Sequence, residues 1–423
     1  MLTNSIGFYK GGIGLKQLLK KYFETSLIKK ITVALIAGIA VGLIFGENAS
    51  VLAPFGDLLM RLLQFIIIPL ILFTLIVGVN QTTIEGLGRM GGKVFLYYVV
   101  TSAIAIIVGT SVASLFNPGT GLTLDGSESF DSPDSPGLTE VILNIVPDNI
   151  AVAFTEMNLL GIIFTAIVFG IAISYLRSSP SNRDIGDKLY RGAEALNEMT
   201  ITVMKGILQY IPFGIFAIIA GIVGTQGVST LLSLGNFILV LYVALAVQLV
   251  LYIGLLLATK TKLGSFFREA RTPMLTAFVT QSSTGTVPIT LNAAKKLGIR
   301  QSLYGFSIPL GSTINMDGAA IRVAVSAVFA ANVIGEPLGF AAILQIVLIG
   351  TLATIGTAGV PGAGIIMIAT VFAQLGLPME AVALLAAVDV LIGMGATALN
   401  VTGDLVGTKV IDKTEKNKTE AEA

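Results

Sequence analysis

Two short polar runs interrupt long apolar stretches in the C-terminal half of the chain. One contains Asn315 and Asp317, and the other contains Asn400 and Asp404. Carboxylate and carboxamide oxygens, together with backbone carbonyls freed where a helix unwinds, are the ligands that a hard cation such as sodium prefers. Such residues can also join helices by hydrogen bonds alone. Because two are ionisable, the pattern favours a cation site at an interruption in each helix.

A third polar run is rich in hydroxyl groups and contains Ser282, Ser283 and Thr284, followed by Gly285 and Pro288. The N-terminus of a helix offers free backbone N–H groups, and with serine hydroxyls beside them it binds anions well. The run therefore predicts a receptor for a substrate carboxylate. The alternative is a tight turn without a ligand, since the same residue types favour turns.

The elements that hold these runs are predicted to be membrane helices. Of 423 residues, 54% are hydrophobic and 12% charged, whereas soluble proteins average about 25% charged residues. Apolar runs such as 94–115 and 237–258 are long enough to cross a bilayer about 30 Å thick. Backbone polar groups in lipid must be paired within the protein, which favours helices. We therefore expect an all-α membrane protein with eight transmembrane helices.

Basic residues predict the topology, because lysine and arginine accumulate on the cytoplasmic side. The segment 273–294 has basic flanks at both ends, so it is predicted to enter the membrane and return as an inner re-entrant hairpin. The segment 341–375 has neutral or acidic flanks and predicts a second hairpin that enters from outside. Opposed hairpins, each followed by an interrupted helix, are typical of the inverted repeats of secondary transporters. Both termini are expected in the cytoplasm.

Other functional classes find little support in the sequence. Cysteine and histidine are absent, and no pair of nucleophile and base suggests an enzyme. A net charge of +1 does not indicate a nucleic-acid partner.

Three motifs, Asn-Met-Asp-Gly at 315–318, Gly-Thr-Ala-Gly-Val-Pro-Gly at 356–362 and Asn-Val-Thr-Gly-Asp at 400–404, occur in this order. In these motifs, and over nearly its whole length, the chain resembles the glutamate transporter family, the dicarboxylate/amino acid:cation symporters, and is most similar to its archaeal sodium-coupled members. The resemblance implies a homotrimer in the plasma membrane of a prokaryote. It also implies sodium-coupled symport of a small carboxylate, of the amino-acid or dicarboxylate class, by an elevator motion.

The resemblance also divides the chain into functional parts. Spans 1, 2, 4 and 5 are expected to form the trimerisation scaffold, and spans 3 and 6 to move with the transport domain. The expected parts are an interfacial N-terminal segment (1–30), spans 1–6 (31–259), a core transport domain (260–409) with inner hairpin (264–296), span 7 (301–332), outer hairpin (339–376) and span 8 (379–408), and a disordered tail (410–423).

About three sodium sites are implied by the same resemblance. The first consists of carbonyls of Gly311, Asn315 and Asn400 with the carboxylate of Asp404. The second consists of Tyr98, Thr101, Ser102, Asn315 and Asp317. The third consists of carbonyls of Thr313, Thr354, Ile355 and Thr357 beside the Met316 thioether.

The substrate site departs from the family pattern. The implied lining is Gln281, Ser282, Ser283, Thr284, Ala319, Arg322, Gly359, Val360, Asp389, Gly393, Ala396, Thr397 and Asn400. In amino-acid carriers of the family an aspartate that binds the substrate ammonium stands at the position of Gly393, and an arginine that binds a side-chain carboxylate stands at that of Ala396. A substrate that lacks its charge partners loses the bonds that offset desolvation. We therefore expect a small carboxylate without an α-amino group, or one that holds this group differently.

Arg322 is an additional charge within an apolar segment, and it supports two interpretations. Its guanidinium either binds an anionic group of the substrate or forms a structural ion pair with Asp389. For the protein as a whole, the alternatives to a symporter are an anion-conducting, channel-like protein and a variant of the same fold whose altered pocket transports poorly.

Overall fold

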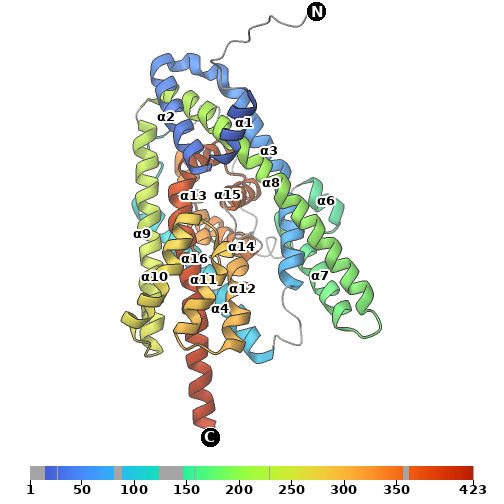
Figure 1. Ribbon diagram of the computed structural model, residues 1–423. Coiled ribbons are helices and arrows are strands. Elements are labelled where there is room, and N and C mark those ends of the chain that lie inside the picture. The colour runs from blue at the N-terminus through green and yellow to red at the C-terminus, as the bar shows by residue number, and fades with distance from the viewer. Residues whose placement is uncertain are drawn as a thin grey trace, which may run out of the picture.

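The protein is described by a computed structural model that covers residues 15–25, 27–80, 88–122, 146–156, 158–227, 229–355 and 362–422. Within these ranges every regular element is a helix (Figure 1). The helices are α1 (Leu15–Glu24), α2 (Leu27–Phe45), the 3-10 helix η1 (Gly46–Leu52), α3 (Ala53–Asn80), α4 (Gly88–Phe116), α6 (Ile150–Thr155), α7 (Leu159–Ser178), α8 (Arg183–Gln226), α9 (Ser229–Ala258), α10 (Leu263–Thr280), α11 (Ser283–Lys296), α12 (Gln301–Ile314), α13 (Asp317–Val333), α14 (Phe340–Ile355), α15 (Ala363–Leu375) and α16 (Met379–Glu422).

Seven helical runs in the described residues are long and apolar enough to cross a membrane. The first, Lys29–Asn80, is divided by η1 into α2 and α3, which agrees with the eight predicted spans. Large apolar side chains such as Ile44, Leu115 and Phe340 are at least 75% exposed, as expected where lipid replaces water. The run that combines α12 and α13, in contrast, is buried inside the protein and belongs to its core.

The chain reverses direction between α10 and α11 at the position predicted for the inner hairpin tip. Gln281 adopts a left-handed conformation (φ 52°) that ends α10, and Ser282 caps α11 by accepting a hydrogen bond from the Gly285 amide at 3.0 Å. The two helices contact each other side by side. Helices α14 and α15 flank the predicted outer tip. The tip itself, with Thr357, Gly359 and Val360, lies outside the described residues.

One of the two predicted helix interruptions is present. Helix α12 ends at Ile314 and α13 begins at Asp317, so Asn315 and Met316 lie in a non-helical link. At Asn400 the prediction was wrong, because α16 continues through this residue without a break. The glycines nearby serve close helix packing instead of unwinding. A Cβ atom at Gly403 would lie 2.5 Å from the Tyr252 hydroxyl.

The C-terminal tail also differs from the prediction of disorder. Helix α16 extends to Glu422 and projects beyond the other helices (Figure 1). The first turns of the tail are held by polar contacts that the sequence did not reveal. Asp412 accepts a hydrogen bond from Arg300 Nε at 2.8 Å, and Glu415 forms an ion pair with Lys93. These contacts keep the tail helical where it leaves the core.

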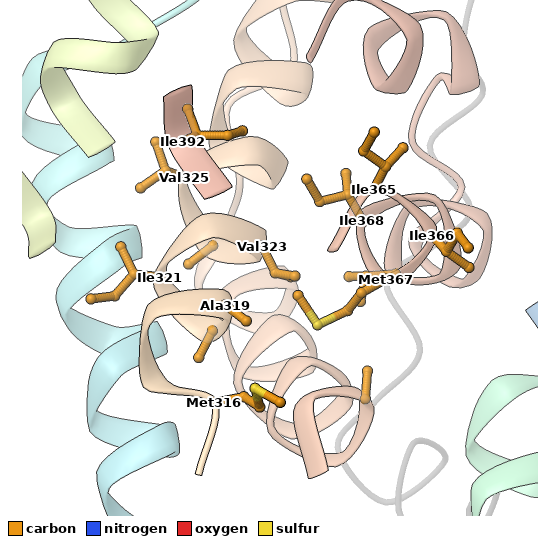
Figure 2. Packing of buried hydrophobic residues seen from close by; sticks show 14 of the residues in the cluster. Met316, Ala319, Ile321, Val323, Val325, Ile365, Ile366, Met367, Ile368 and Ile392 are labelled. Carbon is orange, nitrogen blue, oxygen red and sulfur yellow. The ribbon is translucent and has the colours of Figure 1, made fainter. Parts of the chain in front are cut away.

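Apolar packing fixes α13 against its neighbours around the polar link. Figure 2 shows Val323 of α13 beside Met367 of α15, and Ile392 of α16 near Val325. All four side chains are buried. Asn315 and Met316, which precede α13, are therefore attached to a closely packed helix, and this packing limits their movement.

Candidate functional site

The link between α12 and α13 meets α16 through Asn315. The Asn315 side chain donates hydrogen bonds to the Asp404 carboxylate at 3.0 Å and to the Asn400 carbonyl at 3.4 Å. Gly311 adjoins the same carboxylate, since a Cβ atom at this residue would lie 2.3 Å from Asp404 Oδ1. The structure thus brings together all four residues of the first predicted sodium site, Gly311, Asn315, Asn400 and Asp404.

A second polar group surrounds Asp317 at the start of α13. Ser102 of α4 donates a hydrogen bond to one carboxylate oxygen at 2.8 Å. Thr101 lies beside it, with its hydroxyl 3.4 Å from Asn315 Oδ1. The hydroxyl of Tyr98 is directed elsewhere, because it donates to the Ser307 carbonyl at 2.9 Å and lies close to Gly311. Four of the five residues of the second predicted site therefore meet, and Tyr98 adjoins the first.

Two residues of α9 complete the surroundings of Asp317 and were missed by the sequence reasoning. Tyr252 donates a hydrogen bond to the second carboxylate oxygen at 2.5 Å, and both side chains are fully buried. Gln248, one turn earlier, is 1% exposed, and its Oε1 atom has no hydrogen-bond partner among the described residues. The sequence pattern that could have identified them is a glutamine and a tyrosine four residues apart in an otherwise apolar span.

Asp317 and Asp404 are 0% and 1% exposed. Within the described ranges neither carboxylate forms an ion pair with a lysine or arginine. Burial of an ionised carboxylate without a compensating charge costs several kcal/mol. The hydrogen bonds from Asn315, Ser102 and Tyr252 supply dipoles but no positive charge. One bound monovalent cation at each carboxylate would compensate the two negative charges.

Asn400 has a structural task that differs from the predicted contact with substrate. Its side-chain oxygen accepts hydrogen bonds from the Gly318 amide at 2.7 Å and the Ala319 amide at 3.3 Å, and its amide donates to the Met316 sulfur at 3.2 Å. The N-terminus of α13 has no side-chain cap from its own chain neighbour Met316. Asn400 therefore caps α13 from another helix and satisfies amides that would otherwise lack partners.

No hydrogen bond between the predicted ligands of the third sodium site is found within the described residues. Met316 lies in the helix link and contacts Asn400 through its sulfur atom. The hydroxyls of Thr313 and Thr354 bond to carbonyls of their own helices, at 3.0 and 2.8 Å. Ile355 is the last residue of α14, and Thr357 is not described.

Arg322 and Asp389 form an ion pair between α13 and α16, and their side chains are each 6% exposed. The pairing interpretation of Arg322 is therefore confirmed. The contact uses Nη2 of the guanidinium. The Nε atom is buried without a hydrogen-bond partner among the described residues, which leaves this donor unused by the protein.

Several predicted substrate residues gather beside the pair. A Cβ atom at Gly393 would lie 2.6 Å from the side-chain oxygen of Gln281 and 3.8 Å from Arg322 Nη1. A Cβ atom at Gly364 would approach Arg322 Nη1 still more closely. These two glycines thus leave room for the Arg322 guanidinium and the Gln281 carboxamide. A larger residue at position 393 would displace both side chains.

The other predicted substrate residues that the structure describes lie on α11, α13 and α16. Ser283 is buried in the first turn of α11, and Thr284 follows it in the same turn. On α16, Thr397 donates to the Gly393 carbonyl at 2.8 Å. Ala396 is packed against α13, since a Cβ atom at Gly318 would clash with its carbonyl. Ala319 is buried two residues into α13.

Comparisons with known proteins extend over nearly the whole chain. The model of the sodium:dicarboxylate symporter family matches residues 27–414. The chain is 30% identical to a proton/sodium-glutamate symport protein of Bacillus subtilis (strain 168) over 409 residues, which cover 93% of this chain and 94% of the relative. It is 29% identical to a similarly described protein of Geobacillus stearothermophilus over 410 residues (93% and 95%), and 29% identical to a C4-dicarboxylate transport protein of Deinococcus radiodurans over 405 residues (92% and 89%).

Proposed function

Because this chain belongs to the sodium:dicarboxylate symporter family, we propose that it is a secondary-active transporter that carries a small carboxylate together with sodium ions. The observation that carries this proposal is the pair of buried carboxylates, Asp317 and Asp404, that have no cationic side chain as partner within the described residues. A site of this kind is stable as a charged species only with a bound cation.

The sodium ligands are proposed from the oxygens around the α12–α13 link. One ion would bind to Asp404 with carbonyls of Gly311, Asn315 and Asn400. A second would bind to Asp317 with Asn315, Thr101 and Ser102, and Tyr252 and Gln248 would hold Asp317 in place from α9. The third, with Met316, Thr313, Thr354, Ile355 and Thr357, follows from family resemblance.

The substrate is proposed to be a small carboxylate that lacks an α-amino group. At the expected ammonium position Gly393 has no side chain, and the nearby Asp389 carboxylate is neutralised by Arg322. The spare Nε donor of Arg322 fits an anionic group of the substrate, which combines the two interpretations of this residue. Ser283 and Thr397 would bind the main carboxylate. Asn400 would act indirectly, because its side chain caps the N-terminus of α13.

The larger assembly is proposed by analogy with the family. Three chains would form a homotrimer in the plasma membrane, with both termini in the cytoplasm. Helices α10–α16 would move as a transport domain together with α4 and α9, past a scaffold that includes α2, α3, α7 and α8. The helical pair α10–α11 would be the inner re-entrant hairpin, and α14 with α15 would form the outer one.

A thermal-shift screen of the purified protein tests the substrate class, because a ligand stabilises the state that it binds. Amino acids, keto acids and dicarboxylates are each added with sodium chloride or choline chloride. We expect a carboxylate without an α-amino group, such as succinate or 2-oxoglutarate, to raise the melting temperature only with sodium. L-Aspartate is expected to have no effect at micromolar concentration, and sodium-dependent stabilisation by micromolar L-aspartate would contradict the proposed substrate class.

A further inference from the structure

A strongly basic cavity of about 270 Å³ has a lining that shares no residue with the predicted sodium and substrate sites. Its lining comes from the α9–α10 loop, the first turns of α10, the end of α11 and the C-terminal part of α16. The lining residues are Lys260, Thr261, Lys262, Ser265, Arg268, Glu269, Lys296, Leu297, Lys409 and Lys413. Six cationic side chains therefore face this cavity together with one carboxylate.

Four of the six cations at the cavity are not neutralised by a carboxylate of the protein within the described residues. Glu269 is engaged by Arg268, whose Nε atom donates to it at 3.0 Å. Of the other cations, Lys260, Lys262, Lys296 and Lys413 form no ion pair with any carboxylate in the described residues. Like charges held close together repel, even where water reduces the repulsion. A bound anion would relieve this repulsion.

The cavity also has positioned donors. Lys409 is 9% exposed, and its ammonium group is fixed by a hydrogen bond to the Leu297 carbonyl at 2.8 Å. Helix α10 begins at this cavity, and Lys262 at its N-cap position makes no side-chain capping bond. The backbone N–H groups of the first turn of α10 favour an anion in the same place. Basic residues that only orient a protein in the membrane need to lie on a common side, and they need not converge from three helices and a loop on one cavity.

We propose that this cavity binds a phosphate group. A phosphate has several strong acceptor oxygens and suits a set of lysine ammonium groups, which act on it as point charges. The headgroup of an anionic phospholipid and free inorganic phosphate share this chemistry. Bound phosphate would join the α10–α11 pair to the α9–α10 loop and α16. It would therefore stabilise the packing of α10 and α11 against α16, the helix that carries Asp404.

The test uses the full chain in neutral detergent, without substrate, so that its result is independent of the proposed transport function. Melting temperature is measured against inorganic phosphate at constant ionic strength, and against phosphatidylglycerol with phosphatidylcholine as the neutral lipid. The double variant Lys262→Gln, Lys296→Gln is compared with Arg191→Gln, Lys205→Gln, which removes two exposed cations of α8 and leaves the cavity unchanged.

We expect stabilisation of the native chain and of the α8 variant. In the cavity variant the concentration for half-maximal stabilisation should rise at least about tenfold, because charge-assisted contacts are lost. A shift with phosphatidylglycerol alone identifies a lipid headgroup as the source, and a shift with inorganic phosphate identifies the free anion. The proposal is overturned if neither probe stabilises the native chain, or if both double variants respond equally.

Discussion

Replacement of Asp404 by asparagine is expected to weaken sodium binding by about 10- to 100-fold and to leave the fold intact. The carboxylate is buried and accepts a hydrogen bond from Asn315 at 3.0 Å. Asparagine has the same shape and still accepts this bond through its carbonyl oxygen, so packing is preserved. It lacks the negative charge, and the loss of one charged contact is worth about 1.5–3 kcal/mol.

The measurement is a sodium titration followed by thermal shift, with choline chloride to hold ionic strength constant. Asp184→Asn is the matched control, because it removes an exposed carboxylate on α8 that pairs with Lys188. In the absence of sodium, the melting temperature of the Asp404→Asn protein should equal or exceed that of the native protein, because an uncompensated buried charge has been removed. Native sodium affinity in this variant would exclude Asp404 as a ligand.

Replacement of Arg322 by methionine is expected to destabilise the protein by about 3–5 kcal/mol, since it leaves the buried Asp389 carboxylate without its partner. The converse change, Asp389→Leu, leaves a buried guanidinium and should have a comparable effect. The double variant Arg322→Met, Asp389→Leu removes both charges and should recover most of the native stability. Unfolding by sodium dodecyl sulfate in mixed micelles measures all four proteins, and the coupling energy follows from the cycle.

The double variant also separates the structural role of Arg322 from its proposed role in binding. Sodium affinity should remain native, because in the described residues neither Arg322 nor Asp389 forms an ion pair or hydrogen bond with Asp317 or Asp404. Affinity for the carboxylate substrate should fall at least about tenfold, because the spare Nε donor is lost. Native substrate affinity in a stable double variant would mean that Arg322 only pairs with Asp389.

The interruption at Asn315 was predictable from the sequence because polar residues inside an apolar run need partners, and unwinding supplies them. The same reasoning was wrong at Asn400, where the side chain finds its partners on α13 and the helix continues. A cap supplied by a helix 82 residues away in sequence cannot be recognised from local pattern. The glycines of α16 are ambiguous for a similar reason, since close packing and unwinding both favour glycine.

Most of the residues around the two buried carboxylates were predictable from the sequence. The contribution of α9 to their surroundings was not. Asp317 and Asp404 are ionisable residues in apolar segments, and this property identifies them directly. Tyr252 and Gln248 stand in a span that is otherwise apolar, and tyrosine commonly lies at membrane interfaces without a specific partner. Only the packing of α9 against α4 and α13 indicates that Tyr252 reaches Asp317.

Sodium-driven accumulation of a carboxylate by proteoliposomes that contain the full chain is the most direct test of the proposed coupling. Labelled substrate identified in the thermal-shift screen is offered with an inward sodium gradient, with an inward proton gradient at equal sodium, and with neither. We predict accumulation above the external concentration with the sodium gradient alone, and its collapse when a sodium ionophore is added. Uptake that is equal without the sodium gradient, or that stops at the external concentration, would contradict the proposed coupling.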